Sequence, residues 1–173
     1  MRALFASLFM LLAAPAVAHE PTAYAPMTPF AKLAGHTLRG VSQGPEGNEL
    51  IDIARWEFIL GGKALQSTHR IQDSNYGGRT IFFWDEGAEE YVFHYFTTAG
   101  FHTTGTAEVI ENGFVSIEEV HGDKRYKEVR SVMTFVSDEV VRVESDYVKH
   151  DGELVEGPRF TYTVVDAPGP KFH

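Results

Sequence analysis

The sequence predicts an all-β fold: an antiparallel up-and-down β-barrel of about 8–10 strands with a short N-terminal helical turn. From Gly40 onward, short β-branched and aromatic runs alternate with turn signals, and no long amphipathic helix pattern interrupts them. The pairs Gly61-Gly62 and Asn112-Gly113 supply the positive φ that tight hairpins need. Successive hairpins make a meander, and closing the meander into a barrel removes its exposed edges.

The expected strands cover residues 37–43, 50–60, 63–73, 79–84, 91–98, 102–110, 114–121, 126–136, 139–149 and 159–165. A single helical turn is expected over residues 29–34. The chain divides into a signal peptide (1–18), an extended N-terminal lead-in (19–32), one barrel domain (33–166) and a frayed tail (167–173).

The first 18 residues have the three parts of a secretory signal peptide. Arg2 gives the positive start, residues 3–12 the apolar stretch, and Ala16-Val17-Ala18 the small-residue cleavage site. The apolar stretch is too short for a typical membrane span. We therefore expect a periplasmic or secreted protein that is not inserted in a membrane after signal cleavage.

Composition limits the possible partners further. The chain of 173 residues contains no cysteine, which excludes disulfides, thiolate metal sites and a bacterial lipid anchor. About 155 residues remain after cleavage, enough for one domain with a proper core. The formal net charge is −9, and an acidic domain repels phosphate backbones, so we expect no nucleic acid partner.

The hairpin over residues 54–71 sets a strand register. With Gly61-Gly62 as a two-residue turn, Trp56 lies opposite Ser67, and directly opposed residues share a face. A shift by one residue would bury several charged side chains, so this face must point inward. The inward set is Ala54, Trp56, Phe58, Leu65, Ser67, His69 and Ile71, and the outward charged residues are Arg55, Glu57 and Arg70.

Alternation in the C-terminal strands adds further inward residues. They include Ser131, Met133, Tyr147 and Tyr162, so the interior is mostly apolar with a few polar groups. Small-ligand pockets have this composition. The predicted ligand-binding residues are Trp56, Phe58, Ser67, His69, His94, Ser131, Met133, Tyr147 and Tyr162.

The hairpin over residues 81–96 is apolar on both faces, so alternation does not orient it. One face carries Phe82, Trp84, Tyr91, Phe93 and Tyr95, and the other carries Ile81, Phe83, Val92, His94 and Phe96. We place His94 inward, which leaves the broad aromatic face free to form a homodimer contact.

No dense metal-ligand spacing is present among the eight histidines, and no metal site is expected. A cluster of His69, His94 and His102 is the less favoured reading. It depends on the turn at Ala99-Gly100: a two-residue turn puts His94 and His102 on opposite faces, and a three-residue turn puts them on one face.

The stretch from Arg55 to Gln66 resembles a bacterial lipocalin-like (calycin-type) β-barrel family of unknown function, which carries a W-x(3)-L-G-G-[KR]-x-L hairpin. Phe83-Trp84-Asp85 is similar to the family's G-Y-D turn, with Phe83 in place of the glycine. Leu33-Ala34-Gly35 is similar to its opening motif, but the tryptophan of G-x-W is missing. The resemblance covers residues 33–165 and implies a barrel with a ligand-sized interior and no established reaction.

The leading hypothesis is an exported, non-enzymatic barrel that binds a small hydrophobic or aromatic molecule and needs no cofactor. One alternative is a cofactor-independent lyase or isomerase acting on a small aromatic compound. In it, His69 or His94 would be the general base, and Tyr147 or Tyr162 would stabilise an oxyanion. Another alternative, by fold-level analogy, is haem binding through one axial inward histidine.

Overall fold

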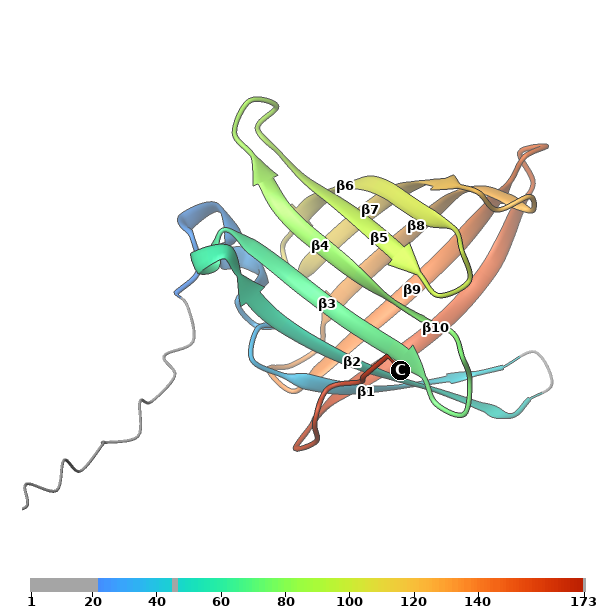
Figure 1. The fold of residues 1–173 in the computed structure, drawn as a ribbon, viewed down its shortest axis with the longest axis horizontal. Coiled ribbons are helices and arrows are strands. Elements are labelled where there is room, and N and C mark those ends of the chain that lie inside the picture. Colours follow the sequence, from blue (N-terminus) through green and yellow to red (C-terminus); the bar gives the residue numbers. More distant parts are fainter. Residues whose placement is uncertain (1–21, 45–46, 173) are drawn as a thin grey trace, which may run out of the picture.

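The computed structural model describes residues 22–44 and 47–172, so the predicted signal peptide lies outside the described residues. Ten antiparallel strands close into an up-and-down barrel, in which β1 pairs with both β2 and β10 (Figure 1). The all-β barrel prediction and the short N-terminal helical turn are confirmed. The elements are η1 (Ala25–Phe30), β1 (Thr37–Gln43), β2 (Glu49–Ile59), η2 (Leu60–Gly62), β3 (Ala64–Ile71), β4 (Gly77–Asp85), β5 (Glu90–Thr97), β6 (His102–Ile110), β7 (Gly113–His121), β8 (Tyr126–Phe135), β9 (Val140–Lys149) and β10 (Leu154–Val165).

The register of the β2–β3 hairpin is confirmed. Trp56 lies opposite Ser67 and Ala54 lies opposite His69, with the charged positions on the outer face. The connection is a single 3₁₀ turn in which Gly61 and Gly62 have φ of 66° and 86°. A side chain at Gly62 would also overlap the carbonyl of Thr22, so this glycine lets the N-terminal segment approach the turn.

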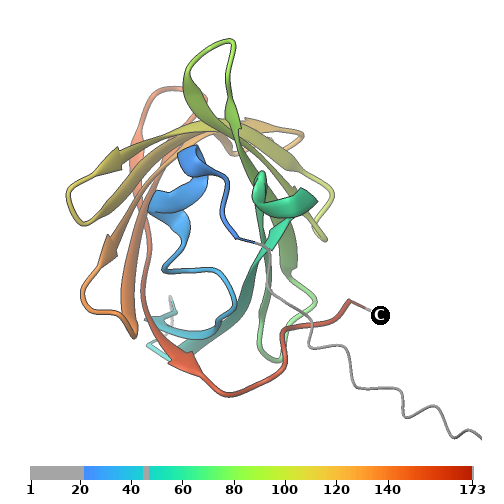
Figure 2. The same ribbon diagram turned by 90° about the vertical axis from the view of Figure 1, so that its left-hand side faces the viewer.

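The N-terminal segment around η1, residues 24–34, lies inside one end of the barrel and forms a plug there (Figure 2). Its 3₁₀ turn η1 begins four residues earlier than the expected range of 29–34. Met27, Phe30 and Leu33 have no exposed surface. The Phe30 ring packs edge-on against Tyr91 at 4.9 Å and Phe114 at 5.1 Å between ring centroids. The plug therefore supplies an apolar floor at the end of the barrel where the resemblance lacks its tryptophan.

The predicted orientation of the central β4–β5 hairpin is wrong. Phe82 and Phe93 are buried against the plug and core, whereas His94 is exposed on the outer face beside Phe96, at 6.4 Å between rings. The aromatic face is the larger apolar surface, so burying it against Phe30 removes more area from water. This face is consequently inside the barrel, and a homodimer through residues 81–96 would have to use the opposite face.

Two β-bulges adjust the strands around the interior. β10 starts at Leu154 rather than at residue 159, because a bulge between Glu156 and Arg159 accommodates Pro158, which has no N–H to donate. A second bulge, in β8, brings Tyr126 to the interior wall.

Within residues 22–44 and 47–172, no helix is long and apolar enough to span a membrane.

We expect Phe30→Ala to lower the free energy of unfolding by about 3–5 kcal/mol, because it leaves a cavity among the rings that the plug contacts. Thr28→Ala is the control, since Thr28 is an exposed residue of the same turn. Urea unfolding followed by circular dichroism measures both. A cost below about 1 kcal/mol for Phe30→Ala would show that the plug does not stabilise the barrel.

Candidate functional site

The barrel encloses a cavity of about 490 Å³ beyond the plug. Its floor is apolar and aromatic, formed by Trp56, Phe82, Phe93 and Phe114. Its opposite end is lined by polar and aromatic residues of the β3–β4, β5–β6 and β7–β8 connections, among them Tyr76, Phe101, Asp123 and Arg125. The side chain of Arg125 is 71% exposed, which places the mouth of the cavity at this end.

Seven of the nine predicted ligand-binding residues lie on the cavity wall. They are Trp56, Ser67, His69, Ser131, Met133, Tyr147 and Tyr162. Phe58 faces inward but packs against the hydrophobic core instead of the cavity. His94 lies on the outer surface of β5, so it is neither a general base nor a ligand-binding residue of this cavity.

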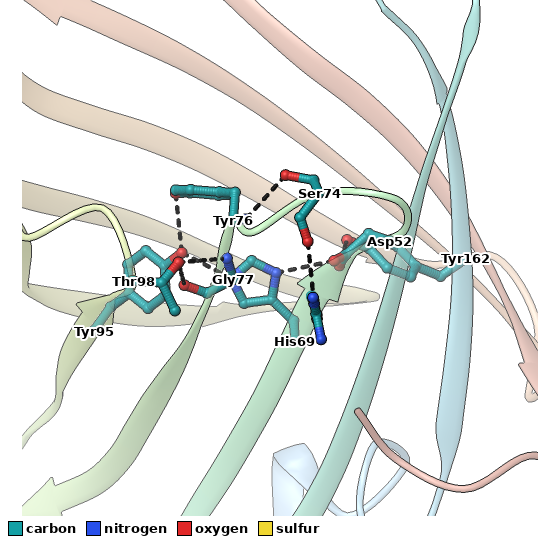
Figure 3. Close-up of polar contacts among 9 residues, drawn as sticks. Asp52, His69, Ser74, Tyr76, Gly77, Tyr95, Thr98 and Tyr162 are labelled. Carbon is teal, nitrogen blue, oxygen red and sulfur yellow. Dashed lines mark hydrogen bonds and ion pairs between the residues drawn. The ribbon is translucent and has the colours of Figure 1, made fainter. Parts of the chain in front are cut away.

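A buried carboxylate organises the middle of the wall. The side chain of Asp52 is 4% exposed and has two partners inside the barrel. Its Oδ1 lies 2.9 Å from Nδ1 of His69, and its Oδ2 accepts a hydrogen bond of 2.8 Å from the Tyr162 hydroxyl. The chain continues from Nε2 of His69 to the Tyr95 hydroxyl at 2.7 Å and from there to the Tyr76 hydroxyl at 3.0 Å (Figure 3).

The chemistry of these groups sets the direction of the hydrogen bonds. A carboxylate only accepts, so Nδ1 of His69 donates to Asp52, and when the ring is neutral its Nε2 accepts. Burial raises the pKa of Tyr95 and of Tyr162, so both phenols stay protonated at neutral pH. With His69 neutral, Tyr95 donates to Nε2 of His69 and Tyr76 donates to Tyr95. All of these protons point toward Asp52, and the tyrosine oxygens keep lone pairs.

Glu118 is a second carboxyl group of the cavity wall. It lies on the inner face of β7 between inward Ser116 and Val120, while Glu119 points to solvent. The Thr103 hydroxyl donates to its Oε2 at 2.6 Å. Burial raises the pKa of the Glu118 carboxyl, and the bond from Thr103 opposes that effect in part. The opposite directions of Glu118 and Glu119 agree with the strand alternation.

The mouth combines an ion pair with stacked rings. Nη2 of Arg125 lies 2.9 Å from Oδ2 of Asp123, and hydrogen bonds from Arg125 lower the pKa of Asp123 to about 2. The guanidinium lies 5.2 Å from the centroid of the Tyr126 ring. Tyr126 stacks on Tyr147 at 4.8 Å, and burial raises the pKa of Tyr147 to about 12. Arg125 thus already has an acidic partner and an aromatic one.

Inward glycines make room for the tyrosine rings of the wall. A methyl group at Gly40 would overlap the ring of Tyr162, and one at Gly78 would overlap the ring of Tyr95. A methyl group at Gly157, at the β10 bulge, would overlap both the Ser145 carbonyl and the ring of Tyr147. Close approach of a ring to the backbone requires glycine at these positions, so the three glycines and the tyrosines form matched pairs.

Sequence reasoning missed several residues of the wall. Asp52 continues the inward alternation of β2 by one more step from Ala54, and Glu118 follows Phe114 and Ser116 at the same spacing, so both had a detectable signal. Tyr95 was hidden by the two apolar faces of its hairpin. Tyr76, Phe101 and the Asp123–Arg125 pair come from connections, where strand alternation gives no orientation.

The histidine cluster considered from the sequence does not exist. His94 and His102 share the outer face of the barrel, where His102 stacks on His121 at 4.9 Å, whereas His69 faces the cavity. In the described part of the chain, no group of three or more His, Cys, Asp or Glu side chains could hold a metal ion. Both ring nitrogens of His69 are also taken by Asp52 and Tyr95.

Fold and site together define a closed ten-stranded barrel with an internal cavity open at one end. No protein-family model matches the chain, and a search of curated proteins finds no match. Among solved structures, it is similar to one described as the crystal structure of Rv2717c from M. tuberculosis. The TM-score is 0.63 at 10% sequence identity, covering 83% of this chain and 99% of the other. This similarity shows the barrel fold, and the lipocalin-like assignment stays a prediction.

We expect Gly40→Ala to lower the free energy of unfolding by about 1–3 kcal/mol, because the methyl group displaces Tyr162 from Asp52. The same substitution in a Tyr162→Ala background should cost much less, since no ring is left to displace. Chemical denaturation of the four proteins in this cycle measures the difference. Equal costs in both backgrounds would contradict the pairing of Gly40 with Tyr162.

Proposed function

We propose that this protein, after export, binds a small, mostly apolar or aromatic molecule inside its barrel. The observation that carries this proposal is the cavity inside the barrel, which has an aromatic floor and polar side chains along its middle and its mouth. Its volume of about 490 Å³ falls within the range of about 300–1,000 Å³ that is common for small-molecule sites.

The layout of the wall favours a ligand with two unlike ends. Trp56, Phe93 and Phe114 at the floor offer apolar surface to a ring or a short chain. Closer to the mouth, Ser131 and Ser145 bond to each other at 2.8 Å, so their hydroxyls do not require a ligand partner to be satisfied. The apolar end of a ligand would therefore enter first, and its polar end would stay near the mouth.

A lyase or isomerase is the second candidate, and the Asp52–His69 pair is the observation that favours it. A carboxylate that holds an imidazole in one orientation is the usual arrangement around a general base. The Tyr95 hydroxyl covers Nε2 of His69, so a proton would have to pass through Tyr95 and Tyr76 to reach a substrate. Tyr162 donates to Asp52, which leaves Tyr147 as the candidate oxyanion donor.

Haem binding is the weakest of the three candidate functions. Iron ligation needs a ring nitrogen with a free lone pair, and His69 is the one histidine of the described residues that lines the cavity. Its two nitrogens already contact Asp52 and Tyr95, so ligation would break one of these hydrogen bonds.

We expect small aromatic or amphiphilic compounds to change the fluorescence of Trp56 and to raise the melting temperature, because bound ligand stabilises the folded state. A Trp84→Phe background leaves Trp56 as the sole tryptophan. A broad panel of such compounds is titrated and binding is confirmed by calorimetry. Absence of both signals across the panel would contradict the proposal.

A matched pair of variants tests whether binding occurs inside the barrel. Ser131→Phe fills the cavity from β8, and Val132→Phe places the same ring on the outer face one residue later. The inner substitution should abolish binding, while the outer one should leave it within about twofold. Equal effects of both would show that the ligand does not enter the cavity.

A further inference from the structure

Acidic groups outnumber basic ones on the polar half of the cavity wall. Three carboxyl side chains line the cavity, those of Asp52, Glu118 and Asp123, against one guanidinium, that of Arg125. Arg125 is already paired with Asp123 through two hydrogen bonds, of 2.9 and 3.3 Å. The inner carboxyl groups therefore receive no direct neutralisation from this cation.

The hydrogen-bond chain adds acceptors rather than donors to the same region. The hydroxyl protons of Tyr162, Tyr95 and Tyr76 all point along the chain toward Asp52 when His69 is neutral. What the three phenols then present to the cavity is their oxygen lone pairs. A ligand group that bonds to these three oxygens must supply the hydrogens.

Among the three carboxyl groups of the cavity wall, Glu118 has the fewest partners that would stabilise a negative charge. It makes no ion pair with any residue in the described part of the chain, and the Thr103 hydroxyl at 2.6 Å is its hydrogen-bond partner. Its burial therefore opposes ionisation, in line with the raised pKa of this carboxyl. A cation placed beside it would reverse that effect by stabilising the charged form.

Aromatic faces surround the approach to these groups. Tyr76 stacks with Phe101 at 6.5 Å, and Tyr126 stacks with Tyr147 at 4.8 Å between ring centroids. Organic cations are attracted to the faces of such rings. Carboxylates, acceptor oxygens and ring faces are three features of different chemistry, and all three favour a positively charged hydrogen-bond donor.

Building on the proposed binding function, we infer that the ligand is an organic ammonium ion with an aromatic or apolar body. The body lies on the floor near Trp56 and Phe93, and the ammonium group donates to Glu118 beneath the rings of the mouth. Glu118 is the residue that selects this class of ligand.

Three probes of similar shape test this selection: 2-phenylethylammonium, 2-phenylethanol and 3-phenylpropanoate. Calorimetry at neutral pH should show the ammonium ion binding about tenfold or more tightly than the alcohol, with the carboxylate weakest. Glu118→Gln should remove most of that advantage and change the affinity for the alcohol by less than about twofold. Glu119→Gln, on the outer face of the same strand, is the matched control and should change neither.

The pH dependence gives a second readout on the unaltered protein. As the pH falls through the raised pKa of Glu118, the carboxyl becomes neutral and the affinity for 2-phenylethylammonium should decrease. Asp52, His69, Asp123 and Arg125 line the same cavity. The same titration of Glu118→Gln is therefore the control, and the part of the pH dependence that this variant loses is the part due to Glu118.

The outcomes distinguish this inference from the function on which it rests. Binding of the alcohol or the carboxylate as tightly as the ammonium ion would overturn the inference and leave the binding function intact. Equal effects of Glu118→Gln and Glu119→Gln would overturn the role of Glu118. Failure of all three probes to bind would count against the binding function itself.

Discussion

The interior of this barrel depends on one requirement: the carboxylate of Asp52 must be satisfied away from water. An unpaired buried charge is strongly destabilising, and the fold meets the requirement with His69 on one oxygen and Tyr162 on the other. Fixing His69 in turn fixes Tyr95 and Tyr76, which lie farther along the same chain of hydrogen bonds. One carboxylate of β2 thereby orients polar groups from β3, the β3–β4 connection, β5 and β10.

The plug and the inward glycines determine the shape of the cavity around this network. The plug around Phe30 fills one end of the barrel and supplies the apolar floor, so the cavity has one mouth. Glycines such as Gly40 and Gly78 bring the tyrosine rings close to the backbone and keep the centre of the barrel open. The result is a gradient from apolar floor to polar mouth, which is the physical basis for expecting a ligand with two unlike ends.

Strand alternation predicted the parts of the molecule in which the two faces differ in polarity. The β2–β3 hairpin was oriented correctly because Arg55 and Glu57 could not be buried. The β4–β5 hairpin is apolar on both faces, so its orientation depends on the plug, a contact distant in sequence that no local pattern encodes, and His94 was misplaced. The inward positions of Tyr76 and Arg125 could not be predicted for a related reason. Both residues lie in connections between strands, and the closed barrel sets the paths of these connections.

The protonation of His69 tests the central role of Asp52 most directly. Nitrogen-15 chemical shifts of the imidazole, measured near neutral pH, report which ring nitrogen carries the proton. If Asp52 has this role, the proton lies on Nδ1, facing Asp52, and Nε2 is unprotonated and accepts from Tyr95. A proton on Nε2, or rapid averaging of the two forms as expected for the exposed His94, would contradict it.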